Sequence, residues 1–330
     1  MAVLFRAFVL ALLFGVAAPL AVAEPSTADN PFDRYPLRFV SIDDVAIAYQ
    51  DMGPRDAEPV LLIMGLGAQM LHWGDTLVQG LLDRGFRVVL LDNRDAGLSQ
   101  KFYELPAPPV WWTGLKDRIG VNAGVPYTLS DMAADAAGLL QQLDIERAHV
   151  VGASMGGMIA QVMAAEHPQR VRSLTSIMSS SGAPELPEPQ PQAVKALASA
   201  ADPADSRREM IERGVAITRA IGSPEFFDEA VARNVTERVI NRGAYGDGML
   251  RQFQAIVASG DRSSLLRGIT APTLVIHGEA DPLLPVGHGR DTAEKIPSAR
   301  FAPIAGMAHG LEPVTSERVL EVLVPFLREH

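Results

Sequence analysis

The feature that most constrains this chain is a single serine set between two apolar segments. Residues 152–156 read Gly-Ala-Ser-Met-Gly, and Ser154 lies at their centre. Residues 149–151 before it have the composition of a buried strand, and residues 158–163 after it have that of a buried helix. A serine at a sharp strand-to-helix turn is held in a strained conformation with its hydroxyl exposed above the sheet. Because the chain has 28 glycines, this pattern is informative only together with its surroundings.

Apolar runs and helical patterns alternate along most of the chain. Runs typical of strands lie at residues 38–40, 45–49, 60–64, 87–91, 171–178, 273–276 and 300–302. Helical patterns lie at residues 75–83, 128–143 and 314–328. This alternation predicts an α/β fold, with a mostly parallel, doubly wound sheet and right-handed crossovers.

The alternation stops at Ala183, where a proline-rich linker begins. Helical patterns then follow one another without a convincing strand, at residues 207–221, 223–241 and 245–259, with Ser223 as the predicted cap of the second helix. We interpret this stretch as a helical cap inserted into the core. The predicted organisation is a core in two parts, residues 24–182 and 268–330, and a cap over residues 183–267.

The first 23 residues have the pattern of a secretory signal peptide. Arg6 precedes an apolar stretch over residues 7–18, and residues 21–23 read Ala-Val-Ala, a small-residue cleavage site. This pattern predicts export to the periplasm or the medium, with cleavage after Ala23 and no stable membrane span in the mature protein. The alternative is an uncleaved N-terminal membrane anchor, for which the apolar run is short.

Composition excludes several classes of function. The formal net charge of −10 argues against nucleic acid as a partner, because phosphates demand a basic surface. The absence of cysteine excludes disulfides and thiolate metal sites. No pattern calls for a metal or a cofactor, and the oligomeric state stays open.

Candidate partners for Ser154 follow it in the chain. His309 lies in a loop of small residues between the last predicted strand and the last predicted helix, which suits a general base. His277 is the rival base, although its place at the end of a strand favours a structural role. Asp281 follows the strand at residues 273–276 and is the candidate acid, with Glu279 as its nearest competitor. The order nucleophile, acid, base is the one that this type of sheet requires.

Two backbone N–H groups are candidates for stabilising an oxyanion. The first is that of Met155, directly after the serine. The second is that of Leu66, in the loop after the strand at residues 60–64, where Gly65 and Gly67 allow close approach of the backbone.

These segments together resemble the α/β-hydrolase superfamily over nearly all of residues 38–328. The similarity is carried by residues 65–67, 92–99, 152–156, 277–281 and 306–310. The group most similar is that of the capped esterases, which resemble aclacinomycin methylesterase and the cofactor-free haloperoxidases. Met64 is a departure, since such proteins usually have a histidine there that supports the loop. The turn at residues 93–99 resembles a structural turn of the family and is assigned no catalytic role.

The resemblance implies acyl hydrolysis, since relatives with an aspartate at the position of Ser154 are dehalogenases or epoxide hydrolases. The leading hypothesis is a serine hydrolase of small or medium apolar carboxylic esters that forms an acyl-enzyme. The alternatives are perhydrolysis, lactone opening or C–C bond hydrolysis at the same residues, or a non-catalytic ligand-binding protein with this fold.

Two further groups of side chains are open to either a functional or a structural interpretation. Met249, Phe253, Ile256 and Val257 either line a substrate pocket or pack within the cap. Trp111 and Trp112 either line an entrance or pack within their own loop.

Overall fold

The computed structural model describes residues 30–105, 124–199, 206–243 and 246–330. Within these residues, eight strands form one sheet in the order β1-β2-β4-β3-β5-β6-β7-β8. The strands are β1 (Arg38–Ile42), β2 (Val45–Met52), β3 (Pro59–Ile63), β4 (Arg87–Leu91), β5 (Ala148–Ala153), β6 (Val171–Ile177), β7 (Thr273–Gly278) and β8 (Ala299–Ile304). β2 is antiparallel to both β1 and β4, and all other neighbours are parallel. The predicted fold class is confirmed.

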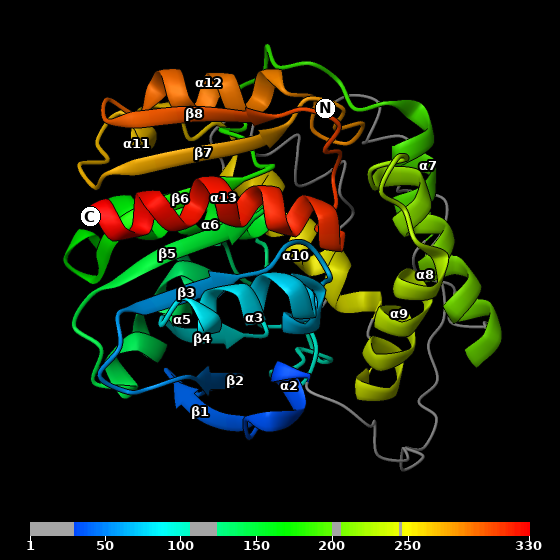
Figure 1. Cartoon of the computed structure of the whole chain (residues 1–330), viewed down its shortest axis with the longest axis horizontal. Helices are drawn as coiled ribbons and strands as arrows, with labels where there is room; N and C mark the ends of the chain where they lie inside the picture. The colour runs from blue at the N-terminus through cyan, green and yellow to red at the C-terminus, as the bar shows by residue number, and fades with distance from the viewer. Residues whose placement is uncertain (1–29, 106–123, 200–205, 244–245) are drawn as a thin grey trace.

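Helices cover both faces of the sheet, as Figure 1 shows. They are α2 (Pro31–Arg34), α3 (Asp75–Asp83), α5 (Leu129–Gln142), α6 (Met155–Glu166), α12 (Gly287–Lys295) and α13 (Pro313–Glu329), with short 3-10 turns at Met70–Trp73 and Pro168–Arg170. α3 and α13 share one apolar core with the sheet, and α5 and α6 share the other. Because β4 is buried on both faces of the sheet, all of its residues after Arg87 are apolar, and the buried guanidinium of Arg87 pairs with Asp51.

A local sequence signal accounts for the start of α5. The Thr128 side chain accepts a hydrogen bond from the backbone N–H of Asp131, and the Asp131 carboxylate accepts one from the N–H of Thr128. This reciprocal cap fixes the start of α5 at Leu129, one residue later. α3 and β4 have the bounds that the sequence predicts.

The described residues between β6 and β7 form five helices, and we call this segment, residues 183–267, the helical insertion. They are α7 (Pro191–Ala198), α8 (Arg207–Ile221), α9 (Glu229–Gly243), α10 (Gly246–Ser259) and α11 (Ser263–Leu266). Figure 1 shows α7, α8 and α9 grouped beside one end of the sheet. The two ends of the insertion meet, because the N–H of Arg262 donates to the carbonyl of Ser181 and its guanidinium donates to that of Ser180.

The predicted start of α9 is wrong. The helix begins at Glu229 and not at the Ser223-Pro224 pair. The N–H and hydroxyl of Ser223 instead donate to the carboxylate of Glu312, just before α13, at 2.7 and 3.1 Å. A buried tertiary contact therefore uses the side chain that the local pattern assigned to a helix cap. α7 is also missing from the prediction, which treated its first residue, Pro191, as linker.

No helix in the described part of the chain is long and apolar enough to cross a membrane. The predicted signal peptide, Trp111 and Trp112 lie outside the described residues.

Candidate active site

Ser154 lies at the junction between β5 and α6 in a conformation that is unfavourable for a residue with a side chain. Its φ is +55° and its ψ is −121°. The surrounding backbone holds this geometry: the N–H of Ser154 donates to the carbonyl of Ile177 at 2.9 Å, and its carbonyl accepts from the Ser179 hydroxyl at 2.7 Å. The strained serine that the sequence predicts is therefore present.

The glycines on either side of Ser154 are required by close packing. A Cβ on Gly152 would overlap the carbonyl oxygen of Gly156, and a Cβ on Gly156 would overlap the carbonyl oxygen of Ile63 in β3. Strand and helix thus cross at a distance that only glycine allows.

The structure brings the three side chains predicted to work together into hydrogen-bond contact. The Oγ of Ser154 lies 3.0 Å from Nε2 of His309, and Nδ1 of His309 lies 2.7 Å from Oδ2 of Asp281. His309 and Asp281 are buried, whereas Ser154 is half-buried and remains accessible. With Nδ1–H donating to the carboxylate, Nε2 is the atom left to accept the serine proton.

Asp281 is held as an anion. Its Oδ1 accepts from the backbone N–H groups of Leu283 and Leu284, each at 2.8 Å. Burial works to raise the pKa of Asp281, but the charge of His309 and hydrogen bonds from His277 and His309 outweigh it and hold the pKa well below its usual range. Glu279, the competing acid in the sequence, is exposed.

His277 supports the Asp281 loop, and among the described residues it forms no hydrogen bond with Ser154. Its Nε2 donates to the carbonyl of Leu284 at 2.7 Å and lies 3.4 Å from Oδ2 of Asp281. Its Nδ1 is buried without a hydrogen-bond partner among the described residues. The contacts of its Nε2 with Leu284 and Asp281 hold this loop, and it is His309 that takes the position expected of a base.

The glycine loop, residues 65–68, lies directly against the serine. A Cβ on Gly65 would be 3.1 Å from Cβ of Ser154 and 3.6 Å from its Oγ. In the described part of the chain, the N–H groups of Leu66 and Met155 donate to no protein acceptor. Both are therefore available for an oxyanion, and the N–H of Gly67 is engaged elsewhere.

Two residues that hold the glycine loop are not identified by the sequence. Asn93, in the turn assigned a structural role, donates from Nδ2 to the carbonyl of Met64 at 2.8 Å. Gln252, in α10, accepts from the N–H of Gly67 at 2.7 Å. No local pattern identifies Gln252, because its partner lies 185 residues away in the chain.

The four residues proposed for a pocket have different environments. Val257 is buried, and Phe253 and Ile256 are half-buried. The side chain of Met249 covers Gly67, where an added Cβ would lie 2.9 Å from its Cγ. Met249 thus contacts the glycine loop.

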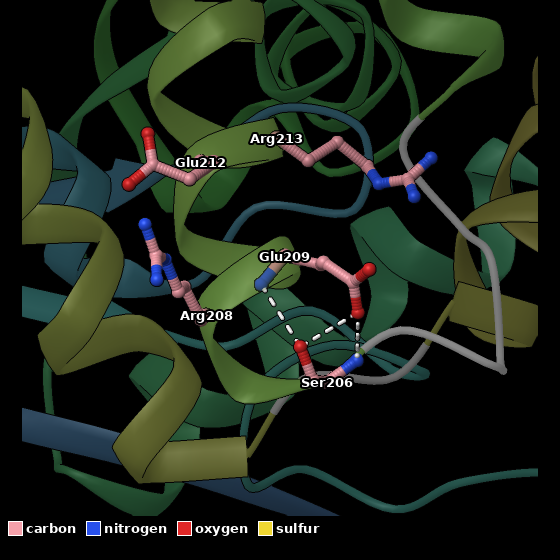
Figure 2. Close-up of a pocket in the computed structure, with 5 residues that line it drawn as sticks. All are labelled: Ser206, Arg208, Glu209, Glu212 and Arg213. Atoms are coloured by element: carbon pink, nitrogen blue, oxygen red, sulfur yellow. Dashed lines mark hydrogen bonds between the residues drawn. The ribbon is translucent and has the colours of Figure 1, made fainter.

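A separate surface pocket lies at the start of α8 and is shown in Figure 2. It is lined by Ser206, Arg208, Glu209, Glu212 and Arg213. Ser206 and Glu209 bind each other there as the cap of α8, and no residue predicted for the site lines this pocket. Nothing in the described residues groups three or more histidine, aspartate or glutamate side chains as a metal site would.

Comparisons with known proteins agree with this architecture. A family model for the alpha/beta hydrolase fold matches residues 58–311. The rhodomycin D methylesterase DnrP of Streptomyces peucetius is 28% identical, over 84% of this chain and 93% of its own. The putative non-heme bromoperoxidase BpoC of Mycobacterium tuberculosis is 28% identical, over 80% of this chain and 91% of its own.

Solved structures show the same fold. The meta-cleavage product hydrolase of Pseudomonas fluorescens superposes with a TM-score of 0.69 at 18% identity, covering 88% of this chain and 97% of that one. The sheet order, the serine turn and the family match lead to one conclusion: the chain belongs to the α/β hydrolase fold family.

Proposed function

We propose that this protein is a serine hydrolase that cleaves small or medium apolar carboxylic esters through an acyl-enzyme on Ser154. The observation that carries the proposal is the hydrogen-bonded series from Asp281 through His309 to Ser154. The similarity to rhodomycin D methylesterases favours an ester as the substrate.

In this mechanism, Nε2 of His309 takes the proton of Ser154 as Oγ bonds to the ester carbonyl carbon. The N–H groups of Met155 and Leu66 stabilise the oxyanion. When the tetrahedral intermediate collapses, the C–O bond to the alcohol breaks and His309 gives its proton to the alcohol. Water then attacks the acyl carbon as His309 takes its proton, the bond from that carbon to Oγ of Ser154 breaks, and His309 returns the proton to Oγ as the carboxylic acid leaves. Asp281 keeps the imidazole in the required tautomer and stabilises its protonated form.

The direct test is covalent labelling with a fluorophosphonate, combined with hydrolysis of esters of increasing acyl length. We expect the wild-type protein to be labelled on one site, and Ser154→Ala to fold normally but lose both labelling and hydrolysis. A folded wild-type protein that neither reacts with the probe nor hydrolyses any ester would refute the proposal. The preferred acyl length reports the size of the substrate pocket.

The same residues would serve perhydrolysis, lactone opening or C–C bond hydrolysis, and one relative is named a non-heme bromoperoxidase. Lactones, a vinylogous diketone and hydrogen peroxide with a carboxylic acid therefore belong in the same panel. Ester binding without turnover would instead support a non-catalytic binding protein.

We also propose that the helical insertion, residues 183–267, is a cap that sets substrate specificity on a core formed by residues 24–182 and 268–330. Contacts of α9 and α10 with the glycine loop and its neighbours support this role. We further propose that residues 1–23 direct export to the periplasm or the medium. Mass measurement of the mature protein, expected to begin at Glu24, distinguishes cleavage after Ala23 from an uncleaved membrane anchor.

A further inference from the structure

We propose that Gln252, in α10 of the helical insertion, is a positioning residue that holds the glycine loop in register with Ser154. Turnover would then depend on how this helix docks on the core. The inference rests on the proposed esterase function and adds to that site a residue outside the core.

The amide of Gln252 is fixed at both ends. Its Oε1 accepts from the N–H of Gly67, and its Nε2 donates to the carbonyl of Arg94, each at 2.7 Å. The side chain is fully buried. A flipped amide would set its NH₂ group against the N–H of Gly67 and its oxygen against a carbonyl, so one orientation is strongly preferred.

These contacts hold the backbone of the glycine loop on both sides of Leu66. Asn93 fixes the carbonyl of Met64 before the loop, and Gln252 fixes the N–H of Gly67 within it. Gly65 lies against Ser154 between these two points. Among the described residues the N–H of Leu66 has no protein acceptor, and the two hydrogen bonds on either side of it set its direction.

Arg251, the residue before Gln252, anchors α10 to the core. The guanidinium of Arg251 binds the buried carboxylate of Asp95 through two hydrogen bonds, Nε to Oδ2 at 2.8 Å and Nη2 to Oδ1 at 3.0 Å. The hydroxyl of Tyr127 donates to the same carboxylate at 2.7 Å. Because breaking a buried ion pair leaves an uncompensated charge, α10 resists sliding, and Gln252 stays opposite Gly67.

The catalytic consequence follows from the sensitivity of oxyanion stabilisation to geometry. Loss of one oxyanion donor typically lowers kcat by about 10²–10³-fold, and small displacements cost part of this. We expect loss of the Gln252 clamp to loosen the loop and thereby lower kcat, while ground-state binding of the ester changes little.

The test compares Gln252→Met with Gln254→Met, which changes an equally buried glutamine two residues along the same helix. We expect Gln252→Met to lower kcat by about 10–100-fold with KM within about threefold, and Gln254→Met to stay within about twofold on both. Gln252→Glu keeps the acceptor for Gly67 and loses the donor to Arg94, so its kcat should lie between those of wild type and Gln252→Met.

A second measurement does not depend on activity. Amide hydrogen exchange in peptides covering residues 64–70 should accelerate in Gln252→Met and be unchanged in Gln254→Met. Unchanged exchange, unchanged kcat, or equal losses in the two methionine variants would each overturn the positioning role. If the wild-type protein reacts with no fluorophosphonate and no ester, the proposed function fails, and the exchange measurement still decides whether Gln252 clamps the loop.

Discussion

Asp281 shows how one carboxylate is selected for the site over a nearby one. Its two oxygens receive two backbone N–H groups and His309, and together with His277 these partners keep its pKa low despite burial. Glu279, two residues before it, is exposed. The difference between the two lies in the loop that wraps around Asp281, so it follows from local structure.

Asp281 and Glu279 allow a matched test of the proposed mechanism. Asp281→Asn should lower kcat by about 10⁴-fold, because an amide that donates to Nδ1 forces the proton onto Nε2, where it faces Ser154. Glu279→Gln, which removes an exposed carboxylate, should leave kcat within about twofold. Steady-state kinetics on one ester near pH 7.5, with circular dichroism to check folding, measures both. A larger loss in Glu279→Gln would reverse the assignment.

The predictability of the site depends on how local each signal is. Ser154, Asp281 and His309 are identifiable from sequence because each lies in a short segment with its own pattern, and the three follow a recognisable order. The contacts of Gln252 with Gly67 and of Glu312 with Ser223 join segments 185 and 89 residues apart. A polar side chain gives no sign of a distant backbone partner before the chain is folded.

At the scale of the elements, the junction of β5 and α6 is closely packed. The helix starts so close to β3 that the Cα of Gly156 faces the carbonyl of Ile63. This proximity places Ser154 at the end of the strands, next to the glycine loop.

Gly156→Ala should therefore lower the free energy of unfolding by about 3 kcal/mol, at the upper end of typical overpacking costs, because the new methyl group meets rigid backbone. Gly268→Ala is the control, since its Cβ would meet its nearest neighbour at 3.4 Å and Gly268 is exposed. Urea unfolding at pH 7.5 gives both values. A change below about 1 kcal/mol in Gly156→Ala would mean that α6 can move away from β3.

The elements also differ in how well their sequence predicts them. β4 and α3 have clear periodicity and clear ends, and their predicted bounds agree with the structure. The sequence predicts the wrong start for α9, because a serine followed by a proline has the same local pattern whether or not it caps a helix. The partner of Ser223 in the fold, Glu312, decides between the two.

At the scale of the whole molecule, buried histidines couple folding to pH. His149 and His288 are buried. Burial lowers the pKa of each below the ordinary value near 6.5, and it outweighs the nearby groups that raise the pKa. Below pH 6.5 the unfolded chain therefore binds protons that the folded chain does not, so the free energy of unfolding falls as the pH decreases.

We expect the free energy of unfolding to decrease between pH 7 and pH 5.5, by up to about 1.4 kcal/mol per pH unit for each proton involved. His149→Gln should flatten this dependence, whatever its effect on stability at pH 7. Urea titrations at several pH values measure the slopes, and identical slopes in wild type and His149→Gln would contradict the prediction.

The contact between the two ends of the helical insertion bears on how such a protein can diversify. Arg262 ties the returning chain to Ser180 and Ser181, so the insertion leaves and rejoins the core at one place. Such a segment can be exchanged as a cassette between related proteins without displacing β6 or β7. If the insertion sets specificity and Gln252 positions the glycine loop, as proposed above, a foreign cassette that lacks a glutamine matching Gln252 would bring a new pocket together with a loosened glycine loop. Recombination of insertions would then yield new selectivity at first with low turnover, and recovery of that glutamine would be the earliest adaptive step.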